Sequence, residues 1–364
     1  MRLGYDNWSY EEILEAIMPA ELLGGVPTSF TVAGHVVHLN LRAAYLPYKT
    51  LIAQLILDKN PNVRTVVNKL EDVGADSVFR TFPMEVLAGD PDTCVEVKEA
   101  GCVFAFDFAK VYWNTRLGHE HERVVAKFAP GEAVCDVMAG VGPFAVPAGK
   151  KEVFVWANDL NPESFAALQE NISRNKTDPF VTPFNLDGRH FIRQAVHRWY
   201  HERYLDPAHN PAVLPGKRGK YSRTKALAGV DQTAKPRMVP LPKTFAHFVM
   251  NLPASAVEFL DGFIGAYKGL EHMFEGDDAA KMPYIHVHTF HRETFERGED
   301  FAKEDVVAEL ERYLECSIDP ETVELHSVRR VAPNKGMYCA SFQLPKAAAF
   351  AELPSWARGG GDIG

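Results

Sequence analysis

The sequence predicts an α/β protein whose larger part is a doubly wound, Rossmann-like parallel sheet, preceded by a smaller α+β domain. Two observations predict it. From residue 116 onward short apolar stretches alternate with amphipathic ones, as strands alternate with helices in doubly wound sheets. Residues 132–162 also form a pattern of strand, glycine loop, helix and second strand. We place the α+β domain at residues 1–112, the sheet domain at 113–350 and a flexible tail at 351–364.

The composition is that of a chain large enough for two domains, and we expect no association with a membrane. Its 364 residues are 46% hydrophobic, which supports large cores, but no apolar run is long enough to span a bilayer. Four acidic residues among the first twenty fit neither a signal peptide nor an Arg-rich transit peptide. Five cysteines lack the C-x-x-C spacing of zinc sites, so we interpret them as reduced thiols and expect no metal.

A basic segment interrupts an acidic chain. The formal net charge is −9, yet residues 198–243 contain ten Lys or Arg and three Asp or Glu. A phosphate backbone responds to charge within a Debye length, roughly 10 Å, so this insertion could contact RNA. Its prolines and glycines are also typical of a solvated, partly disordered insertion, and both interpretations stay open.

The elements of the first domain follow from periodicity and from turn residues. A helix is expected from Ser9 to Leu23, beginning in a capping box formed by Ser9 and Glu12. Alternating apolar residues and turn signals predict the remaining elements: strands at 30–33, 36–39 and 63–68, a helix at 48–57, a turn from 79–82 into 84–89, and a hairpin of 94–97 with 102–106.

The second domain alternates strands and helices and closes with an antiparallel hairpin at the sheet edge. We predict strands at 134–137, 153–157, 180–184, 245–250 and 284–289, with a closing pair at 323–331 and 337–342. We predict helices at 116–128, 162–175, from 187 onward, at 254–274 and at 303–316.

The glycine loop at residues 139–144 and the acids beside it favour a cationic ligand. Asp159 follows Gly140 by nineteen residues, the spacing of an acid that accepts hydrogen bonds from ribose hydroxyls. The loop, with Gly142 and then Ala145, is also compatible with NAD. Asp136, inside the end of the first strand, would repel a pyrophosphate but attract the sulfonium and ammonium of S-adenosylmethionine. We therefore favour a methyl-donor site.

Two further strand ends place polar groups at the same edge of the sheet. Asp187 and Gly188 follow the third strand, where an acid suits the adenine amino group, although a turn and helix cap is the alternative. Asn251, shortly followed by Pro253, offers a fixed carbonyl oxygen beside the sulfonium, as an N-methylating enzyme requires. Capping of the next helix is the alternative for Asn251.

The helix at 116–128 offers candidates for a general base. A base is needed if the methyl acceptor is an amide-like nitrogen such as a purine ring N–H, because that nitrogen has no free lone pair until its proton is removed. Glu120 and His121 lie on the 116–128 helix beside the cleft, whereas Glu122 points about 100° further around. Surface charge on an ordinary helix is the alternative interpretation. Arg80, Arg116 and Arg123 could bind phosphate or a purine oxygen.

Together these motifs resemble the eukaryotic and archaeal tRNA (guanine-37, N1)-methyltransferases. The matching segments are 106–117, 120–123, Asp136 with 139–144, 158–162, 185–189 and 250–253, while 34–42 and 66–69 resemble the family's middle domain. The resemblance runs from about residue 25 to 345. It implies a class I methyltransferase sheet, S-adenosylmethionine as cofactor, and methyl transfer to N1 of the guanine 3′ of the anticodon.

The resemblance also implies roles for individual residues. Glu120 corresponds to the general base, Arg80 to the group that steadies charge on guanine O6, and Asn251 with Pro253 to the pair that positions the base. The cofactor-contacting positions are His121, Asp159, Leu160, Asp187, Gly188 and Asn251. Tyr112 and Asn161 correspond to further contributors to substrate positioning.

Three features depart from the family: Met138 where the family usually has Phe, the long basic insertion, and the absence of its separate N-terminal tRNA-gripping domain from the chain as given.

The expected partner is tRNA, bound through its anticodon loop, and we expect a monomer. Family analogy suggests the cytoplasm, with nuclear and mitochondrial matrix pools. A wyosine-pathway aminocarboxypropyl transferase and an inactive tRNA-binding module remain alternatives.

Overall fold

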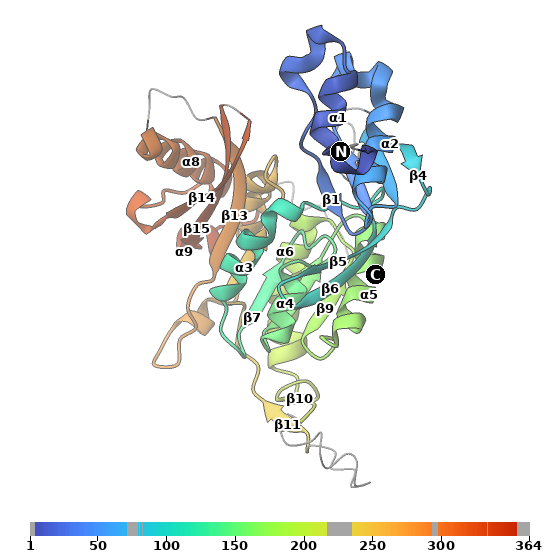
Figure 1. Cartoon of the computed structure of the whole chain (residues 1–364). Helices are drawn as coiled ribbons and strands as arrows, with labels where there is room; N and C mark the ends of the chain where they lie inside the picture. The colour runs from blue at the N-terminus through green and yellow to red at the C-terminus, as the bar shows by residue number, and fades with distance from the viewer. Residues whose placement is uncertain are drawn as a thin grey trace, which may run out of the picture.

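The fold has two parts in a computed structural model that describes residues 4–70, 79, 81, 83–216, 235–292, 298–332 and 334–354. The N-terminal part, drawn in blue, lies above the large sheet in Figure 1. The described residues include no helix that is both long and apolar enough to cross a membrane.

The N-terminal part is a four-stranded sheet with two α-helices. Its strand order is β1-β2-β3-β4, and β2 and β3 are parallel. The bounds are α1 (Tyr10–Ile17), β1 (Thr31–Ala33), β2 (Val36–Leu39), α2 (Lys49–Lys59), β3 (Thr65–Lys69) and β4 (Met84–Gly89). The Ser9–Glu12 capping box is confirmed, but the predicted helix to Leu23 is wrong because the chain leaves helical geometry at Met18, directly before Pro19.

The predicted hairpin is formed by β5 (Cys94–Glu99) and β6 (Cys102–Asp107). Asn171 and Asn175 of α5 (Pro162–Asn175) accept hydrogen bonds from the β6 amides of Ala105 and Val103, at 2.8 and 2.9 Å. The hairpin is thereby fixed to a helix of the large sheet. The predicted domain boundary at residue 112 stays a prediction.

The larger part is a seven-stranded sheet of order β14-β15-β13-β12-β7-β8-β9. Among these seven strands β15 runs opposite to the other six and pairs antiparallel with β13 and β14, so the predicted parallel sheet with an antiparallel edge hairpin is confirmed. The bounds are β7 (Ala133–Asp136), β8 (Phe154–Asn158), β9 (Val181–Phe184), β12 (His247–Met250), β13 (Tyr284–His291), β14 (Glu324–Ala332) and β15 (Lys335–Gln343).

Helices cover both faces of this sheet because alternate residues of each strand point to opposite faces. On one face Cys135 and Phe248 pack with α6 (Gly188–Arg198) and α8 (Gly298–Leu314). On the other, Val134 and Val249 pack with α3 (Gly118–Ala126), α4 (Ala145–Lys150) and α5. The short α9 (Lys346–Ala349) follows β15.

The predicted helix at 254–274 is wrong. The chain forms two 3-10 segments there, η7 (Ala256–Phe263) and η8 (Glu271–Phe274), joined by turns. Gly265 and Gly269 lie between them with φ of +72° and +86°, outside the right-handed helical region. The segment is largely buried, with Val257, Leu260 and Phe263 in the core, but the glycines divide it into two short pieces.

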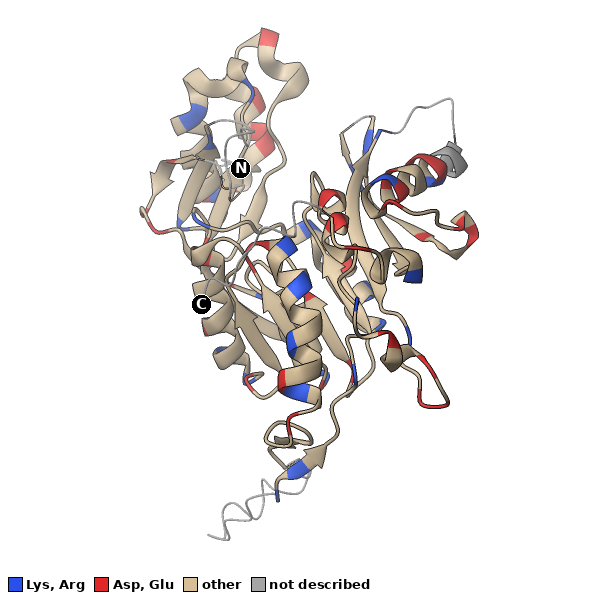
Figure 2. Cartoon of the chain, turned by 180° about the vertical axis from the view of Figure 1, so that it is seen from behind, with Lys and Arg blue, Asp and Glu red and all other residues tan. Residues whose placement is uncertain are grey.

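The basic insertion is ordered at both described ends. After α6 and a π-turn at Trp199–Tyr204, β10 (Ala212–Leu214) pairs with β11 (Arg237–Val239). Figure 2 shows the basic residues along α6 in blue. The insertion's described ion pairs include Arg198 with Glu202, Arg237 with Glu152 and Lys243 with Asp278. Residues 217–234 and the tail beyond 354 lie outside the described residues, so the predicted partial disorder of the insertion and its contact with RNA stay predictions.

Candidate active site

The site lies where the parallel strands end. Asp136, Asn158 and Met250 are the last residues of β7, β8 and β12, and His288 lies one residue beyond the partner of Met250 on β13. The side chain of Asn158 joins these ends by donating to the carbonyls of Val137 and Leu186 at 3.1 and 3.0 Å. Side chains from four distant segments therefore meet at one edge.

The glycine loop has the backbone that the motif predicts. Gly140 has φ +55° and Gly142 has φ +99°. A Cβ on Gly142 would lie 2.8 Å from both Leu168 Cδ1 and Val146 Cγ2, whereas one on Gly140 would meet nothing within 4 Å. Gly142 is needed for packing of the loop on α4 and α5, and Gly140 leaves open space beside the loop.

Asp159 is tied directly to this loop. Its Oδ2 accepts from the Gly140 amide at 2.8 Å, and its Oδ1 accepts from the Asn161 amide at 2.9 Å. Burial raises the pKa of Asp159, and these two amides act in the opposite direction. Each carboxylate oxygen has a second lone pair, so the side chain can still accept from hydroxyl donors. Leu160 is 44% exposed beside it.

Asp136 is a fully buried carboxyl group whose oxygens have no partner with hydrogen-bond geometry within the described part of the chain. Burial and the nearby Asp159 raise its pKa to about 8, although the Met138 amide and His288 lower it. A cationic group of a ligand would supply the missing partner. The donor set therefore fits the positively charged end of S-adenosylmethionine.

Asp187 is the N-cap of α6, which agrees with the alternative interpretation of Asp187 and Gly188 as a turn and helix cap. Its Oδ1 accepts from the amides of Arg189 and His190 at 3.0 and 3.1 Å, and the residue is exposed. Gly188 is buried, with Phe259 3.0 Å from the position of a Cβ. Their predicted contacts with adenine stay predictions.

Asn251 does not cap the following helical segment, which begins after Ser255 without a side-chain cap. Its Oδ1 is buried and lacks a hydrogen-bond partner among the described residues. The carbonyl of Pro253 accepts from the Phe290 amide at 3.0 Å, which attaches this segment to β13. Asn251 therefore holds a fixed, unpaired acceptor at the end of β12.

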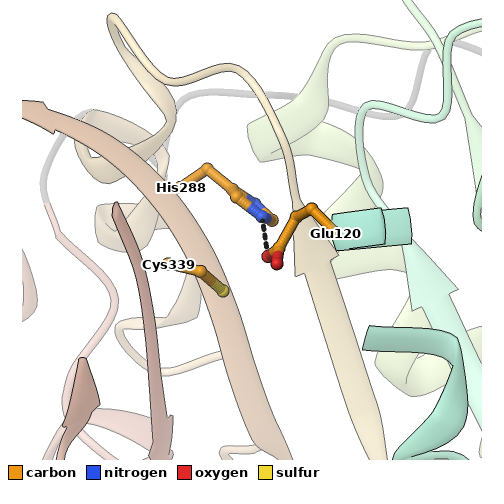
Figure 3. Close-up of side chains that lie close together, drawn as sticks. All are labelled: Glu120, His288 and Cys339. Carbon is orange, nitrogen blue, oxygen red and sulfur yellow. Dashed lines mark hydrogen bonds and ion pairs between the residues drawn. The ribbon is translucent and has the colours of Figure 1, made fainter. Parts of the chain in front are cut away.

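Glu120 is buried rather than part of a solvated helix face. Arg123 donates to both of its oxygens, at 2.7 and 2.8 Å, and His288 Nε2 lies 2.7 Å from Oε1 (Figure 3). Burial raises the pKa of Glu120, but the hydrogen bonds from Arg123 and His288 outweigh burial and lower it to about 2. The carboxylate is therefore ionised at neutral pH.

His288 and Cys339 are the site residues that the sequence analysis missed. They form a cross-strand pair between β13 and β15, and both are fully buried. The available signal was the alternation of His286 and His288 with apolar residues in β13. Ligand atoms of Glu120, His288 and Cys339 lie within 4.8 Å of one another, but Arg123 already engages both Glu120 oxygens, and we assign no metal to them.

His121 faces the hairpin. Its Nδ1 lies 2.6 Å from Glu99 Oε1, and its ring contacts Phe144 edge-on with centroids 4.8 Å apart. It supports the glycine loop through Phe144, and its predicted cofactor contact stays a prediction.

Two substrate-positioning candidates lie on neighbouring loops. Asn161 caps α5 and donates to the Lys110 carbonyl at 2.9 Å, while Tyr112 is 50% exposed. Arg80, the predicted donor to guanine O6, lies outside the described residues.

The sequence of this chain matches family models and curated proteins. Two family models match, the TYW2 N-terminal domain at residues 10–93 and the TRM5/TYW2 methyltransferase domain at 95–200. The tRNA (guanine(37)-N(1))-methyltransferase of Emericella nidulans is 48% identical over 96% of this chain and 74% of its own length. That of Schizosaccharomyces pombe is 47% identical over 97% and 76%. The chain belongs to the tRNA (guanine(37)-N(1))-methyltransferase family.

Solved structures support the fold of this family member. Trm5b from Pyrococcus abyssi has a TM-score of 0.61 at 23% identity, covering 94% of this chain and 82% of that one. The complex of aTrm5 and tRNALeu has a TM-score of 0.62 at 23% identity, covering 94% and 80%. The predicted class I methyltransferase sheet with a preceding smaller domain is confirmed.

Proposed function

We propose that this chain transfers the methyl group of S-adenosylmethionine to N1 of guanine 37, the base 3′ of the tRNA anticodon. The observation that carries the proposal is the placement of an ionised, buried Glu120 at the same sheet edge as Asp136 and Asn251. A base, a site for a cationic donor and a fixed acceptor are what N1 methylation requires. Membership of the family agrees with it.

The cofactor would lie across the glycine loop. Asp136 would pair with its cationic end, Asp159 would accept from the ribose hydroxyls, and Asp187 with Gly188 would border the adenine beside Leu160. Bound there, S-adenosylmethionine supplies an electrophilic methyl group. Gly140 leaves room for the ligand because a Cβ at this position would meet only open space.

The substrate side of the site would act on the guanine itself. Glu120 would accept the N1 proton, and Asn251 Oδ1 would accept a hydrogen bond from the base, which Pro253 helps to place. Arg80 is proposed to donate to guanine O6, with Tyr112 and Asn161 bordering the entry. The base must leave its stack to reach these groups, and an unpaired anticodon loop lowers that cost.

The two alternatives predict different outcomes, an aminocarboxypropyl product in one case and no product in the other. An aminocarboxypropyl transferase would use the same cofactor but would need neither a proton-abstracting Glu120 nor the Asn251 acceptor. An inactive tRNA-binding module would have no reason to keep Glu120 ionised and buried. The relatives named above are methyltransferases, which favours the first proposal.

The deciding experiment incubates the chain with labelled S-adenosylmethionine and unmodified tRNA carrying guanine or adenine at position 37. Nucleoside mass spectrometry then identifies the modification. A methyl group on guanine 37, and none on the adenine variant, supports the proposal. An aminocarboxypropyl adduct, or tRNA binding without turnover, would replace it by the corresponding alternative.

We further propose that the chain acts as a monomer on the anticodon loop. Cytoplasmic action, with nuclear and mitochondrial matrix pools, is the expectation from the family. Light scattering of the complex with one tRNA tests the first point, and imaging of the tagged full-length protein tests the second.

A further inference from the structure

His288 lies where four parts of the site meet. Its Nε2 lies 2.7 Å from Glu120 Oε1, and its Nδ1 lies 3.4 Å from the carbonyl of Met250, the residue before Asn251. Its ring centroid is 6.1 Å from that of Phe144 in the glycine loop, and Cys339 is its cross-strand partner. Figure 3 shows the ring directed at Glu120, with Cys339 beside them. One buried side chain thus links the candidate base to the strand end that carries Asn251.

The two neighbours of the ring define its protonation state. The Glu120 carboxylate and the Met250 carbonyl are both acceptors, so a ring with a proton on each nitrogen satisfies both. Burial lowers the pKa of His288, but Cys339 and Glu120 act in the opposite direction and the net pKa is raised. A charged imidazolium beside a carboxylate is consistent with this geometry.

Hydrogen bonding distinguishes the two oxygens of Glu120. Oε1 receives hydrogen bonds from Arg123 Nη2 and His288 Nε2, whereas Oε2 receives one from Arg123 Nε and no other from the residues that the structure describes. His326 Nε2 is 3.7 Å from Oε2, and this histidine is 41% exposed. Oε2 therefore keeps acceptor capacity on the side of the partly exposed His326.

We propose that His288 is a positioning residue for proton removal, holding Glu120 Oε1 so that Oε2 is presented, ionised, to the N1 proton of the guanine. This inference rests on the proposed function. In the step, the N1–H bond breaks and its proton passes to Oε2. The nitrogen pair forms the new bond to the methyl carbon, and the S–CH₃ pair returns to sulfur.

The charged and titratable groups that face the pair are Arg123 on α3, Cys339 on β15, His326 and Glu324 on β14, and Asp136 on β7. His286 on β13 also lies near, but burial lowers its pKa well below the ordinary value, so its ring is neutral. Methyl transfer needs the Glu120 carboxylate, so the rate falls as pH drops through its pKa. Loss of the His288 charge removes a group that lowers this pKa. The acidic limb of the rate profile must therefore move to higher pH.

The test compares His288→Gln with His286→Gln, a matched change two residues away on the same strand whose ring bonds to His247 and Ser341. Single-turnover methylation of guanine-37 tRNA is measured from pH 3 to 9, with cofactor affinity by calorimetry. The wild type should keep its rate to the lower end of this range, because the pKa of Glu120 is about 2. We expect His288→Gln to slow turnover about 10-fold or more and to raise the pH of the acidic limb, because misalignment of a general base costs part of its ~10²–10⁴-fold contribution. Rates are compared at saturating cofactor because His288 also lowers the pKa of Asp136, and His286→Gln should keep the wild-type profile.

A double variant shows whether His288 acts through Glu120. In a Glu120→Gln background, His288→Gln should cause no further loss of rate. If His288→Gln does not fold, His288→Asn serves as the second replacement. Wild-type rate and limb in the His288 variant, or an additive loss in the double variant, overturn the inference. Absence of methylation by the wild-type chain would instead contradict the proposed function, so the two failures are distinguishable.

Discussion

The Gly140 amide donates to Asp159 across 2.8 Å and joins the glycine loop after β7 to the end of β8. The two residues lie nineteen positions apart and form one rigid unit, because the second Asp159 oxygen is held by Asn161. A ligand bound over the loop therefore meets Asp159 in a fixed position.

Replacement of Asp159 by Ala should weaken cofactor binding and loosen the loop. The Gly140 amide loses its acceptor, and an unpaired buried donor costs about 1–3 kcal/mol. We expect about a 10-fold or larger increase in the cofactor dissociation constant, since 1.4 kcal/mol is a factor of ten. Calorimetry measures it, and Asp178→Ala, at an exposed position, is the control. Equal affinities of the two variants would contradict the ribose assignment.

The two loop glycines should differ in their tolerance of Ala. Gly142→Ala adds a Cβ 2.8 Å from Leu168 and Val146, whereas Gly140→Ala adds one in open space. Both positions have positive φ, so the backbone cost of about 1 kcal/mol is shared and the clash adds 1–3 kcal/mol at Gly142 only. Thermal denaturation should show the larger loss for Gly142→Ala. A larger loss at Gly140 would mean that the loop packs differently.

Glu120→Gln should abolish most of the methyl transfer without loss of the cofactor. An amide cannot take the N1 proton, and general base catalysis contributes roughly 10²–10⁴-fold. Single-turnover rates with guanine-37 tRNA measure the effect. Glu122→Gln, two residues on and exposed, is the matched control and should keep the wild-type rate. Full activity of Glu120→Gln across the pH range would exclude it as the base.

Asp136 should make both stability and cofactor binding depend on pH. Its pKa is raised from 3.8 to about 8, so the stability that the buried neutral acid contributes is present below pH 4 and is lost as pH rises through 8. Asp136→Asn should flatten that part of the profile in thermal denaturation of the ligand-free chain.

Cofactor binding should show the opposite trend, because the cation binds the ionised carboxylate and releases its proton. Affinity should rise between pH 6 and 8 in the wild type and less so in Asp136→Asn. Calorimetry in buffers of different ionisation enthalpy measures the proton released. No release by the wild type would contradict pairing of Asp136 with the cationic end.

Several features were readable from the chain because they depend on neighbouring residues. The Ser9–Glu12 cap, the 94–107 hairpin and the strand, loop, helix pattern after Ala133 are local, and turn and cap chemistry predicts them. The failures were local as well. Pro19 ends the first helix early, and glycines at 265 and 269 break an apolar stretch whose periodicity otherwise indicates a helix.

The sequence by itself indicated the glycine loop and the acids at the strand ends, because each occupies a fixed place in a local motif, whereas Glu120 was indicated as a base by the resemblance to a known family. Only the tertiary structure decided the surroundings of that base. His288 follows Glu120 by 168 residues and reaches it through β13, and Cys339 reaches it through β15. Such contacts arise from the order of strands in the sheet, which brings distant residues together and which no spacing along the chain records.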